Sequence, residues 1–251
     1  MTSDDHLLAA ELAEEAGKRL LDLRADGGSP DELRKAGDWL SHEFLAAELA
    51  ARRPGDAVLS EEGRDNPARL SASRVWIVDP LDGTREFGEA GRTDWAVHVA
   101  LWERGALTAG AVALPAQGQV LSTATPPVVP AGLGGALRVV VSRTRPPAFL
   151  ERLGDFADLT LIPLGSAGAK AAAVIQGEAD AYVHAGGQYE WDSAAPVAVA
   201  VAAGLHASRI DGSALQYNQP DPVLPDILIC RAVLAKPLLD AIAAAGVTRP
   251  A

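Results

Sequence analysis

The most constraining feature of the 251-residue sequence is an apolar run that ends in two carboxylates. Residues 74–80 read RVWIVDP, and an apolar stretch closed by turn residues predicts a buried strand. Asp79 and Asp82 lie three residues apart where this strand meets its turn. Pro80 fixes the turn and Gly83 permits a tight bend; such strand ends are where α/β proteins bind ligands. Two carboxylates with a loop carbonyl form a hard-oxygen set that suits Mg²⁺ better than Zn²⁺.

The backbone after these carboxylates is suited to an anion. Gly83 and Thr84 open a turn in which two backbone N–H groups can point toward a phosphate, as they do at helix N-termini. For an isolated Asp-x-x-Asp pair, a plain turn with a solvated aspartate is the simpler explanation. Because the six residues DPLDGT follow a VWIV strand here, we favour a site that binds a metal and an anion.

Other segments offer further candidates. Glu61 ends the apolar stretch AVLSE and lies 18 residues before Asp79, which is enough chain for a return to a neighbouring strand. Asp192 opens a predicted helix in the segment WDSAAP, where it can cap the helix or face a metal. Ser166 and Lys170, in the glycine-bearing helix start GSAGAK, could hold an anion. Taken alone, Glu61 is better explained as a solvated glutamate and the Ser166–Lys170 segment as a structural turn, and Asp192 is well explained as a helix cap.

The hydrophobic period divides the chain into a helical start, a strand-rich middle and an alternating second half. Apolar residues at helical spacing predict helices over 5–24 and 30–53. Short links imply that the strands of the middle part are antiparallel neighbours. The predicted strands of the first half are 57–61, 74–80, 94–105, 106–114 and 118–124. The second half is predicted to contain strands 137–142, 159–164, 180–185 and 226–231 and helices 146–153, 166–176, 192–203 and 236–245.

A Pro- and Gly-rich stretch at 126–136 predicts a boundary between two halves. Residues 1–125 are then an α+β half that carries most of the candidate ligands. Residues 137–251 are an α/β half that carries Asp192 and the substrate contacts, because alternating strands and helices imply a covered sheet.

Composition limits the class of protein. Lys and Arg number 22 and Asp and Glu 33, giving a net charge of −11, so a nucleic acid polymer is not the expected partner. One cysteine, Cys230, excludes an internal disulfide framework. No run reaches the ~18 apolar residues of a membrane span, and the start MTSDDH has no apolar signal region. We therefore expect a cytoplasmic globular protein.

The segments SEE, DPLDGT and WD, in this order along the chain, resemble the magnesium-dependent, lithium-sensitive phosphatase superfamily that includes inositol monophosphatase. Arg85-Glu86-Phe87 after DPLDGT, the VVVSR segment ending at Arg143, and Gly165-Ser166 with Lys170 resemble the CysQ-type branch of that superfamily. The resemblance covers nearly the whole chain and implies a layered αβαβα sandwich of the sugar phosphatase type. One departure is that Ser29-Pro30 is followed by DELRKAG before Asp38, where the family reads Ser-Pro-x-Thr-x-Ala-Asp.

The resemblance also implies roles for individual residues. The metal ligands it implies are Glu61, Asp79, the carbonyl of Leu81, Asp82 and Asp192. The catalytic residues it implies, which position and deprotonate the attacking water, are Thr84, Asp38 and Glu61. The substrate-binding residues it implies are Gly83, Thr84, Arg143, Ser166, Lys170 and Asp192.

The reaction that the resemblance implies is Mg²⁺-dependent removal of the 3′-phosphate from 3′-phosphoadenosine 5′-phosphate to give AMP, with its 5′-phosphosulfate analogue as an alternative substrate. Two or three Mg²⁺ ions would take part, Mn²⁺ could replace them and Li⁺ would inhibit. Alternatives are an inositol monophosphatase, a fructose 1,6-bisphosphatase or a non-catalytic metal-binding relative. The resemblance implies a small phosphorylated substrate as the partner, and a homodimer is an open alternative to a monomer.

Overall fold

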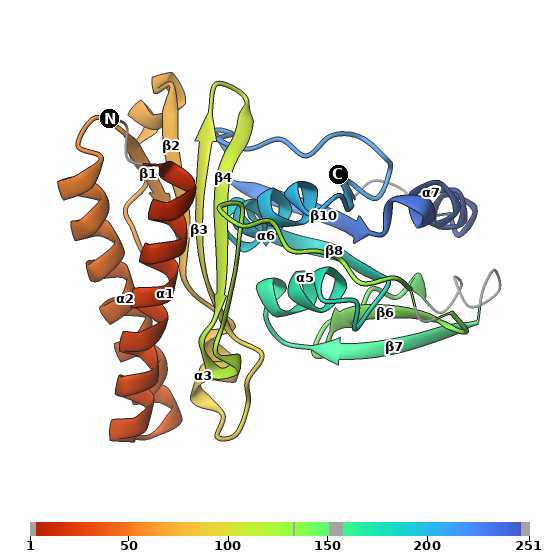
Figure 1. Cartoon of the computed structure of the whole chain (residues 1–251), viewed down its shortest axis with the longest axis horizontal. Helices are drawn as coiled ribbons and strands as arrows, with labels where there is room; N and C mark the ends of the chain where they lie inside the picture. Colours follow the sequence, from red (N-terminus) through yellow and green to blue (C-terminus); the bar gives the residue numbers. More distant parts are fainter. Residues whose placement is uncertain (1–3, 133, 151–157, 247–251) are drawn as a thin grey trace.

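The computed structural model describes residues 4–132, 134–150 and 158–246, which form five stacked layers (Figure 1). These are a helix pair, a five-stranded sheet, a second helix pair, a second five-stranded sheet and an outer helix. The predicted αβαβα sandwich is thereby confirmed. The helices are α1 (Asp5–Asp26), α2 (Pro30–Arg52), α3 (Thr84–Gly88), α5 (Ala167–Ile175), α6 (Glu190–Ala202) and α7 (Ala235–Ala244), with 3₁₀ turns at Pro67–Ser71, Pro115–Gln117 and Ala232–Leu234.

The first sheet has the order β1-β2-β3-β4-β5. Its strands are β1 (Ala57–Ser60), β2 (Arg74–Asp82), β3 (Ala96–Glu103), β4 (Ala106–Leu114) and β5 (Gln119–Ser122). β3, β4 and β5 are antiparallel neighbours, as their short links predict. β1 instead runs parallel to β2, with Ser60 paired to Val78. Because the two strands run in the same direction, the residues that follow each of them emerge at one edge of the sheet.

The second sheet has the order β7-β6-β8-β10-β9 and is mixed. Its strands are β6 (Leu137–Ser142), β7 (Leu159–Leu164), β8 (Ala181–Tyr189), β9 (His206–Ser208) and β10 (Val223–Cys230). β6 is parallel to both β7 and β8, whereas β10 is antiparallel to β8 and β9. The short strand β9 was not predicted, because three residues are too few to show an alternation of apolar and polar side chains. The helix predicted over 146–153 extends into residues outside those described.

One predicted helix start is wrong. The sequence places the start of the helix at Asp192, but α6 begins at Glu190, so Asp192 is its third residue and supports the start by accepting the N–H of the cap residue Tyr189 at 2.6 Å. The earlier start has a tertiary cause, because the Glu190 carboxylate accepts the backbone N–H groups of Asn218 (2.6 Å) and Gln219 (2.7 Å). As a result Pro196 lies inside the helix and not in its first turn.

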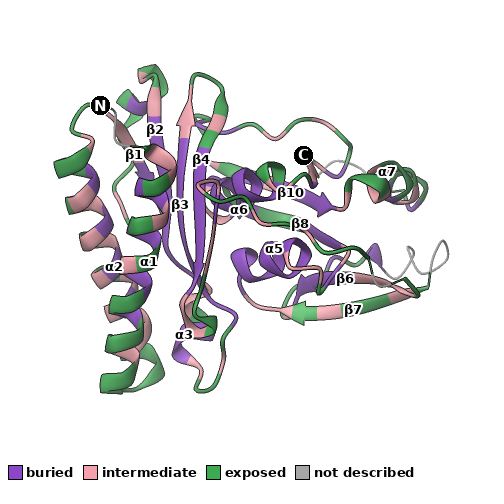
Figure 2. Ribbon diagram, in the orientation of Figure 1, coloured by how far each residue is buried: buried purple, intermediate pink, exposed green. Residues whose placement is uncertain are grey.

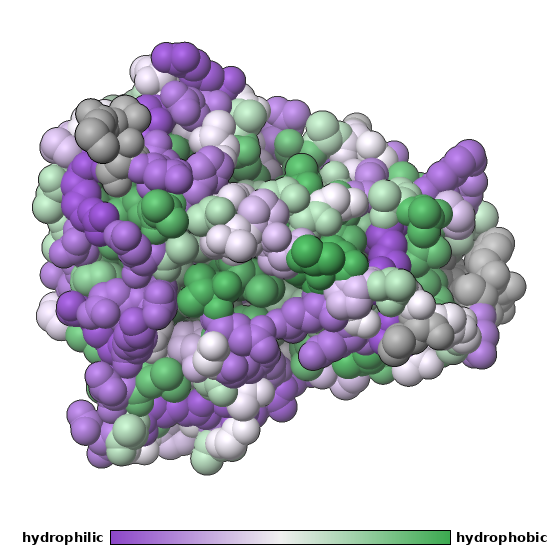
Figure 3. Space-filling model, in the orientation of Figure 1, coloured by the Kyte–Doolittle hydropathy of each residue, from purple (hydrophilic) through white to green (hydrophobic). Residues whose placement is uncertain are grey.

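Apolar residues fill the spaces between the layers, so that the sheets and the α5–α6 layer are mostly buried (Figure 2). Alanines let α6 approach the first sheet closely: a Cβ on Gly110 of β4 would lie 2.7 Å from the Cβ of Ala198. The hydrophilic surface in Figure 3 lies mainly over the α1–α2 side. Within the described residues, no helix is both long and apolar enough to cross a membrane.

Two further sequence expectations concern the middle of the chain and its cysteine. In the described part of 126–136 there is no helix or strand, but the division into two domains stays a prediction. Cys230 is fully buried at the end of β10 and unpaired.

Candidate active site

The ends of β1 and β2 and the first turn of α6 bring several carboxylates together. Glu61 directly follows β1, and Asp79 and Asp82 belong to the last residues of β2. Asp192 arrives from the second half of the chain, because α6 packs against β2 between the two sheets. Carboxylate oxygens of Asp79, Asp82 and Asp192 lie within 4.8 Å of one another. We call Glu61, Asp79, Asp82 and Asp192 the carboxylate end of the site.

Three members of the carboxylate end are held where their charges are unfavourable. Burial, and then repulsion by Glu61, raises the pKa of Asp79 well above its usual range. Removal from water, followed by repulsion from Asp192, raises the pKa of Glu61 to about 7. Burial and the charge of Asp82 raise the pKa of Asp192 to about 6. Among the described residues, no lysine or arginine forms an ion pair with any of these three carboxylates.

Asp82 is the exception, because the protein itself surrounds its charge with donors. One carboxylate oxygen accepts the Ser166 hydroxyl and the Gly168 N–H, both at 2.6 Å, and the other accepts the Ala167 N–H at 3.2 Å. The Nε2 atom of the buried His98 lies 3.2 Å away. Burial alone would raise the pKa of Asp82, but His98, and to a smaller degree Lys170 and Ser166, outweigh it and lower this pKa to about 2.

The donors to Asp82 stand at the N-terminus of α5, where unpaired backbone N–H groups attract anions. Ser166 caps this helix, as the sequence predicts, by accepting the Ala169 N–H at 2.9 Å. Gly168 allows the close approach, because a Cβ there would lie 2.2 Å from the Nε2 atom of His98. The site therefore depends on contact between the first-half strand β2 and the second-half helix α5.

The carboxylate end suits a divalent cation on chemical grounds. Its donors are hard oxygens, which Mg²⁺ prefers, and bound positive charge would cancel repulsion that the protein leaves uncompensated at Asp79 and Glu61. The carbonyl oxygen of Leu81 lies in the same turn and accepts the Thr84 hydroxyl at 3.0 Å. The described residues thus fit a metal site, while the individual ligand assignments stay predictions.

Asp38 and Thr84, which the sequence separates by 46 positions, lie side by side. The Thr84 hydroxyl is 3.1 Å from Oδ1 of Asp38, so α2 brings its carboxylate to the turn after β2. Burial raises the pKa of Asp38 to about 6, although the Thr84 hydroxyl opposes the rise. Gly83, which precedes Thr84 and α3, has a φ of +86°, a backbone conformation that favours glycine. The departure from the family spacing before Asp38 therefore does not prevent this pairing.

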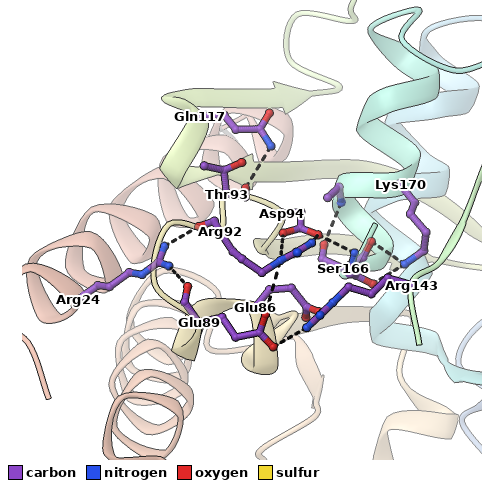
Figure 4. A network of polar contacts seen from close by, with 12 residues as sticks. Arg24, Glu86, Glu89, Arg92, Thr93, Asp94, Gln117, Arg143, Ser166 and Lys170 are labelled. Atoms are coloured by element: carbon purple, nitrogen blue, oxygen red, sulfur yellow. Dashed lines mark hydrogen bonds and ion pairs between the residues drawn. The ribbon is translucent and has the colours of Figure 1, made fainter. Parts of the chain in front are cut away.

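A network of polar contacts ties the two halves together beside the site (Figure 4). Arg92 forms an ion pair with Asp94, whose carboxylate accepts the Gly165 N–H at 2.7 Å. The Lys170 ammonium donates to the carbonyls of Gly165 (2.5 Å) and Ser166 (2.8 Å). Burial lowers the pKa of Lys170 to about 8. These contacts fix the loop that leads into α5.

Arg143 belongs to the same network and is already paired. Its guanidinium donates to Glu86 at 2.5 Å and to Glu89 at 2.6 Å, and Figure 4 shows it directed toward these carboxylates. The prediction that Arg143 contacts the substrate stays a prediction.

A cavity of about 490 Å³ opens beside the carboxylate end, which is large enough for a small phosphorylated molecule. Glu61, Asp82 and Asp192 line it together with Lys170, Arg145 and His184, and the charge of Lys170 lowers the pKa of both Asp192 and His184. We call Arg145 and His184 the basic end.

Three side chains of this region are not predicted by the sequence pattern: His98, Arg145 and His184. Strand alternation could have placed His98 on the face of β3 opposite to Val97 and Val99, but nothing local indicates that this face meets Asp82. Arg145 lies two residues after the VVVSR segment, which singles out Arg143 instead, and His184 is an isolated histidine with no motif around it.

Comparison with known proteins gives a consistent result. A model of the inositol monophosphatase family matches residues 6–245. A protein of Mycobacterium bovis described as a 3′-phosphoadenosine 5′-phosphate phosphatase is 57% identical over 239 residues, which cover 91% of this chain and 90% of that protein. A Mycobacterium leprae protein of the same description is 53% identical over 252 residues, covering 95% and 93%. The 3′(2′),5′-bisphosphate nucleotidase CysQ of Salmonella typhimurium is 30% identical over 239 residues, covering 85% and 94%.

Solved structures agree on the fold. CysQ from Bacteroides thetaiotaomicron, described as a bacterial member of the inositol monophosphatase family, superimposes with a TM-score of 0.76 at 25% identity and covers 90% of this chain and 97% of its own. The extragenic suppressor protein suhB of Bartonella henselae gives a TM-score of 0.78 at 20% identity, covering 96% and 100%, and so shares the fold.

Proposed function

Because the chain belongs to the inositol monophosphatase family, we propose that it is a metal-dependent phosphatase that removes the 3′-phosphate of 3′-phosphoadenosine 5′-phosphate and leaves AMP. The observation that carries this proposal is the 57% identity, over nine-tenths of both chains, to a protein described as a phosphatase for this substrate. The cluster of Asp79, Asp82 and Asp192 beside a 490 Å³ cavity supports it.

The proposed cofactor is Mg²⁺, as two or three ions, with Mn²⁺ as a substitute and Li⁺ as an inhibitor. Its proposed ligands are Glu61, Asp79, the Leu81 carbonyl, Asp82 and Asp192. When bound, such ions supply positive charge that stabilises the developing negative charge on the phosphate and the leaving oxygen. Without that charge, a phosphate would face repulsion from several carboxylates.

The side chains of the protein then have distinct tasks. The Thr84 hydroxyl, held by Asp38, orients the attacking water, and Glu61 accepts its proton. The water oxygen forms a bond to phosphorus while the bond between phosphorus and the ribose 3′-oxygen breaks. That oxygen takes a proton from solvent and becomes a hydroxyl group.

We propose that the scissile phosphate is bound by backbone N–H groups at the start of α3. Gly83 and Thr84 offer backbone N–H groups at the start of α3, and Lys170 supplies positive charge from within the cavity wall. Ser166 and Arg143 act indirectly, since Ser166 holds Asp82 and Arg143 holds Glu86 and Glu89. Asp192 contributes both to the metal and to the substrate side of the cavity.

The wider organisation is also proposed. Residues 1–125 and 137–251 would form two domains joined by 126–136, in a cytoplasmic protein whose partner is a small phosphorylated molecule. The site is built from one chain, so a homodimer would not be needed to complete it.

The test is phosphate release from 3′-phosphoadenosine 5′-phosphate, inositol 1-phosphate and fructose 1,6-bisphosphate, measured with Mg²⁺, with EDTA, and with Mg²⁺ plus Li⁺. We expect Mg²⁺-dependent, Li⁺-inhibited preference for the nucleotide. If the enzyme prefers the inositol or fructose compound, the proposed metal site stands and the proposed nucleotide substrate is wrong. Absence of release from all three would favour a non-catalytic metal-binding relative.

A further inference from the structure

One buried side chain in the cavity wall has no partner. His184, on β8, is only 4% exposed, and within the described residues neither of its ring nitrogens has a hydrogen-bond partner. Burial, with the charges of Lys170 and Arg145, lowers the pKa of His184 to about 4. The nearby backbone of Gly187 and the charge of Asp226 oppose this shift more weakly. The ring is therefore neutral near pH 7 and keeps one N–H to donate. A buried donor without a partner costs free energy that a ligand can recover.

Charge is distributed unevenly along the cavity that His184 lines. Acidic side chains gather at the carboxylate end, whereas Arg145 and His184 form the basic end, and the charge of Lys170 acts on both Asp192 and His184. Once the carboxylates hold metal ions, one phosphate binds there. A ligand that reaches the basic end gains most if it carries a second negative charge.

The two arginines after β6 differ in what they can offer. Arg143 is held by Glu86 and Glu89. Arg145 lines the cavity, and among the described residues no carboxylate pairs with its guanidinium; only its backbone N–H is engaged, by Ser142 at 3.2 Å. Arg145 is therefore the arginine with an open guanidinium for an anion.

We propose that His184 and Arg145 form a subsite for the second, non-scissile phosphate of the substrate, and so set the preference for bisphosphates over monophosphates. This inference rests on the proposed function and adds residues that decide which phosphorylated nucleotides are preferred. The His184 N–H donates to a phosphate oxygen, and Arg145 supplies a full positive charge at the mouth of the cavity. Neither residue takes part in bond breaking.

The test compares kcat/KM for 3′-phosphoadenosine 5′-phosphate with kcat/KM for 3′-AMP, which lacks the second phosphate. His184→Leu keeps the volume of the side chain and removes the donor, and we expect it to lower kcat/KM for the bisphosphate about tenfold. Arg145→Gln is expected to lower it about fivefold, mainly through KM and more strongly at low salt. Turnover of 3′-AMP should change less than twofold in both variants, which also shows that they fold.

Two further variants serve as controls. Arg104→Gln removes the same charge from the exposed β3–β4 turn, at the sheet edge opposite to the site, and should alter neither substrate. His184→Asn restores a short donor and should recover part of the preference.

Equal loss on both substrates, or an unchanged ratio, would overturn the subsite while leaving the proposed function intact. A wild-type enzyme that releases no phosphate from the bisphosphate would overturn both.

Discussion

The carboxylate end and the basic end of the cavity present opposite electrostatic problems. At the first, Asp79 and Asp192 lie within 4.8 Å of Asp82, and among the described residues no basic side chain is paired with either. At the second, His184 and Arg145 offer donors that no acceptor in the described part of the chain uses. Each end lacks what a ligand would bring, a cation at one and an anion at the other. The difference indicates a substrate held at two separated points.

A second difference lies within the carboxylate end. Asp82 accepts three hydrogen bonds from the start of α5 and lies 3.2 Å from the Nε2 atom of His98, whereas Asp79 accepts one, from the Leu81 N–H at 3.1 Å. Asp82 therefore stabilises the fold as well as offering a metal ligand. Asp79 is buried at a cost that protonation or a bound cation must offset, as its raised pKa shows, so the two aspartates should respond differently to the same substitution.

The largest effect is expected from Asp79→Asn. Loss of a metal-binding carboxylate should lower kcat by about 10³-fold or more, which corresponds to about 4 kcal/mol. In EDTA the same variant should be more stable than wild type by about 1 kcal/mol, because it removes a buried charge that has no cation beside it. Phosphate release and urea unfolding in EDTA measure the two effects. A variant that is less stable than wild type in EDTA would contradict this account.

Asp82→Asn should reverse the sign of the stability effect. The amide cannot accept all the donors from α5 and leaves His98 and Lys170 buried without their carboxylate. We expect a loss of about 3 kcal/mol in the free energy of unfolding in EDTA, along with loss of turnover. Urea unfolding of both variants under one condition provides the comparison, and equal stabilities would remove the distinction between the two aspartates.

The contrast between the ends also explains what the sequence could predict. Asp79, Asp82, Gly83 and Thr84 are contiguous, so one strand and one turn determine their arrangement. Glu61 was within reach of the same reasoning, because parallel pairing of β1 with β2 brings both strand ends to one edge. A local sequence pattern is therefore enough to predict those site residues that one strand and one turn bring together.

The basic end was not predicted because nothing local builds it. His184 faces the cavity only because β8 pairs in a particular register and packs against α5. Arg143 and Arg145 look alike in the sequence, and only the positions of Glu86 and Glu89 show that the first is occupied. The predicted start of α6 was wrong for the same kind of reason, because the backbone N–H groups of the distant residues Asn218 and Gln219 hold Glu190 in place.

His184 at the basic end should make the free energy of unfolding depend on pH. The pKa of His184 is about 4 in the folded protein and about 6.5 when unfolded, so the unfolded state binds more protons between these values. Stability in EDTA should therefore fall as pH decreases below 6.5, by about 2 kcal/mol at pH 5 from this residue. His184→Leu lacks this contribution, so the stability difference between variant and wild type should shift by that amount. A difference that stays constant from pH 7 to pH 5 would show that the ring is accessible to protons in the folded state.

The smallest effect is expected at Arg143 and sharpens its contrast with Arg145. Arg143→Gln removes an ion pair to Glu86, whose side chain is only 6% exposed, and a second to the half-exposed Glu89. Because the pairs lie partly in solvent, we expect a loss of about 1 kcal/mol in the free energy of unfolding. If Arg143 acts only by holding these carboxylates, the ratio of kcat/KM for the bisphosphate to that for 3′-AMP should stay within twofold of wild type, whereas Arg145→Gln changes it without a comparable loss of stability. A variant of Arg143 that lowers the ratio more than Arg145→Gln does would move the anion subsite to the residue that the sequence first suggested.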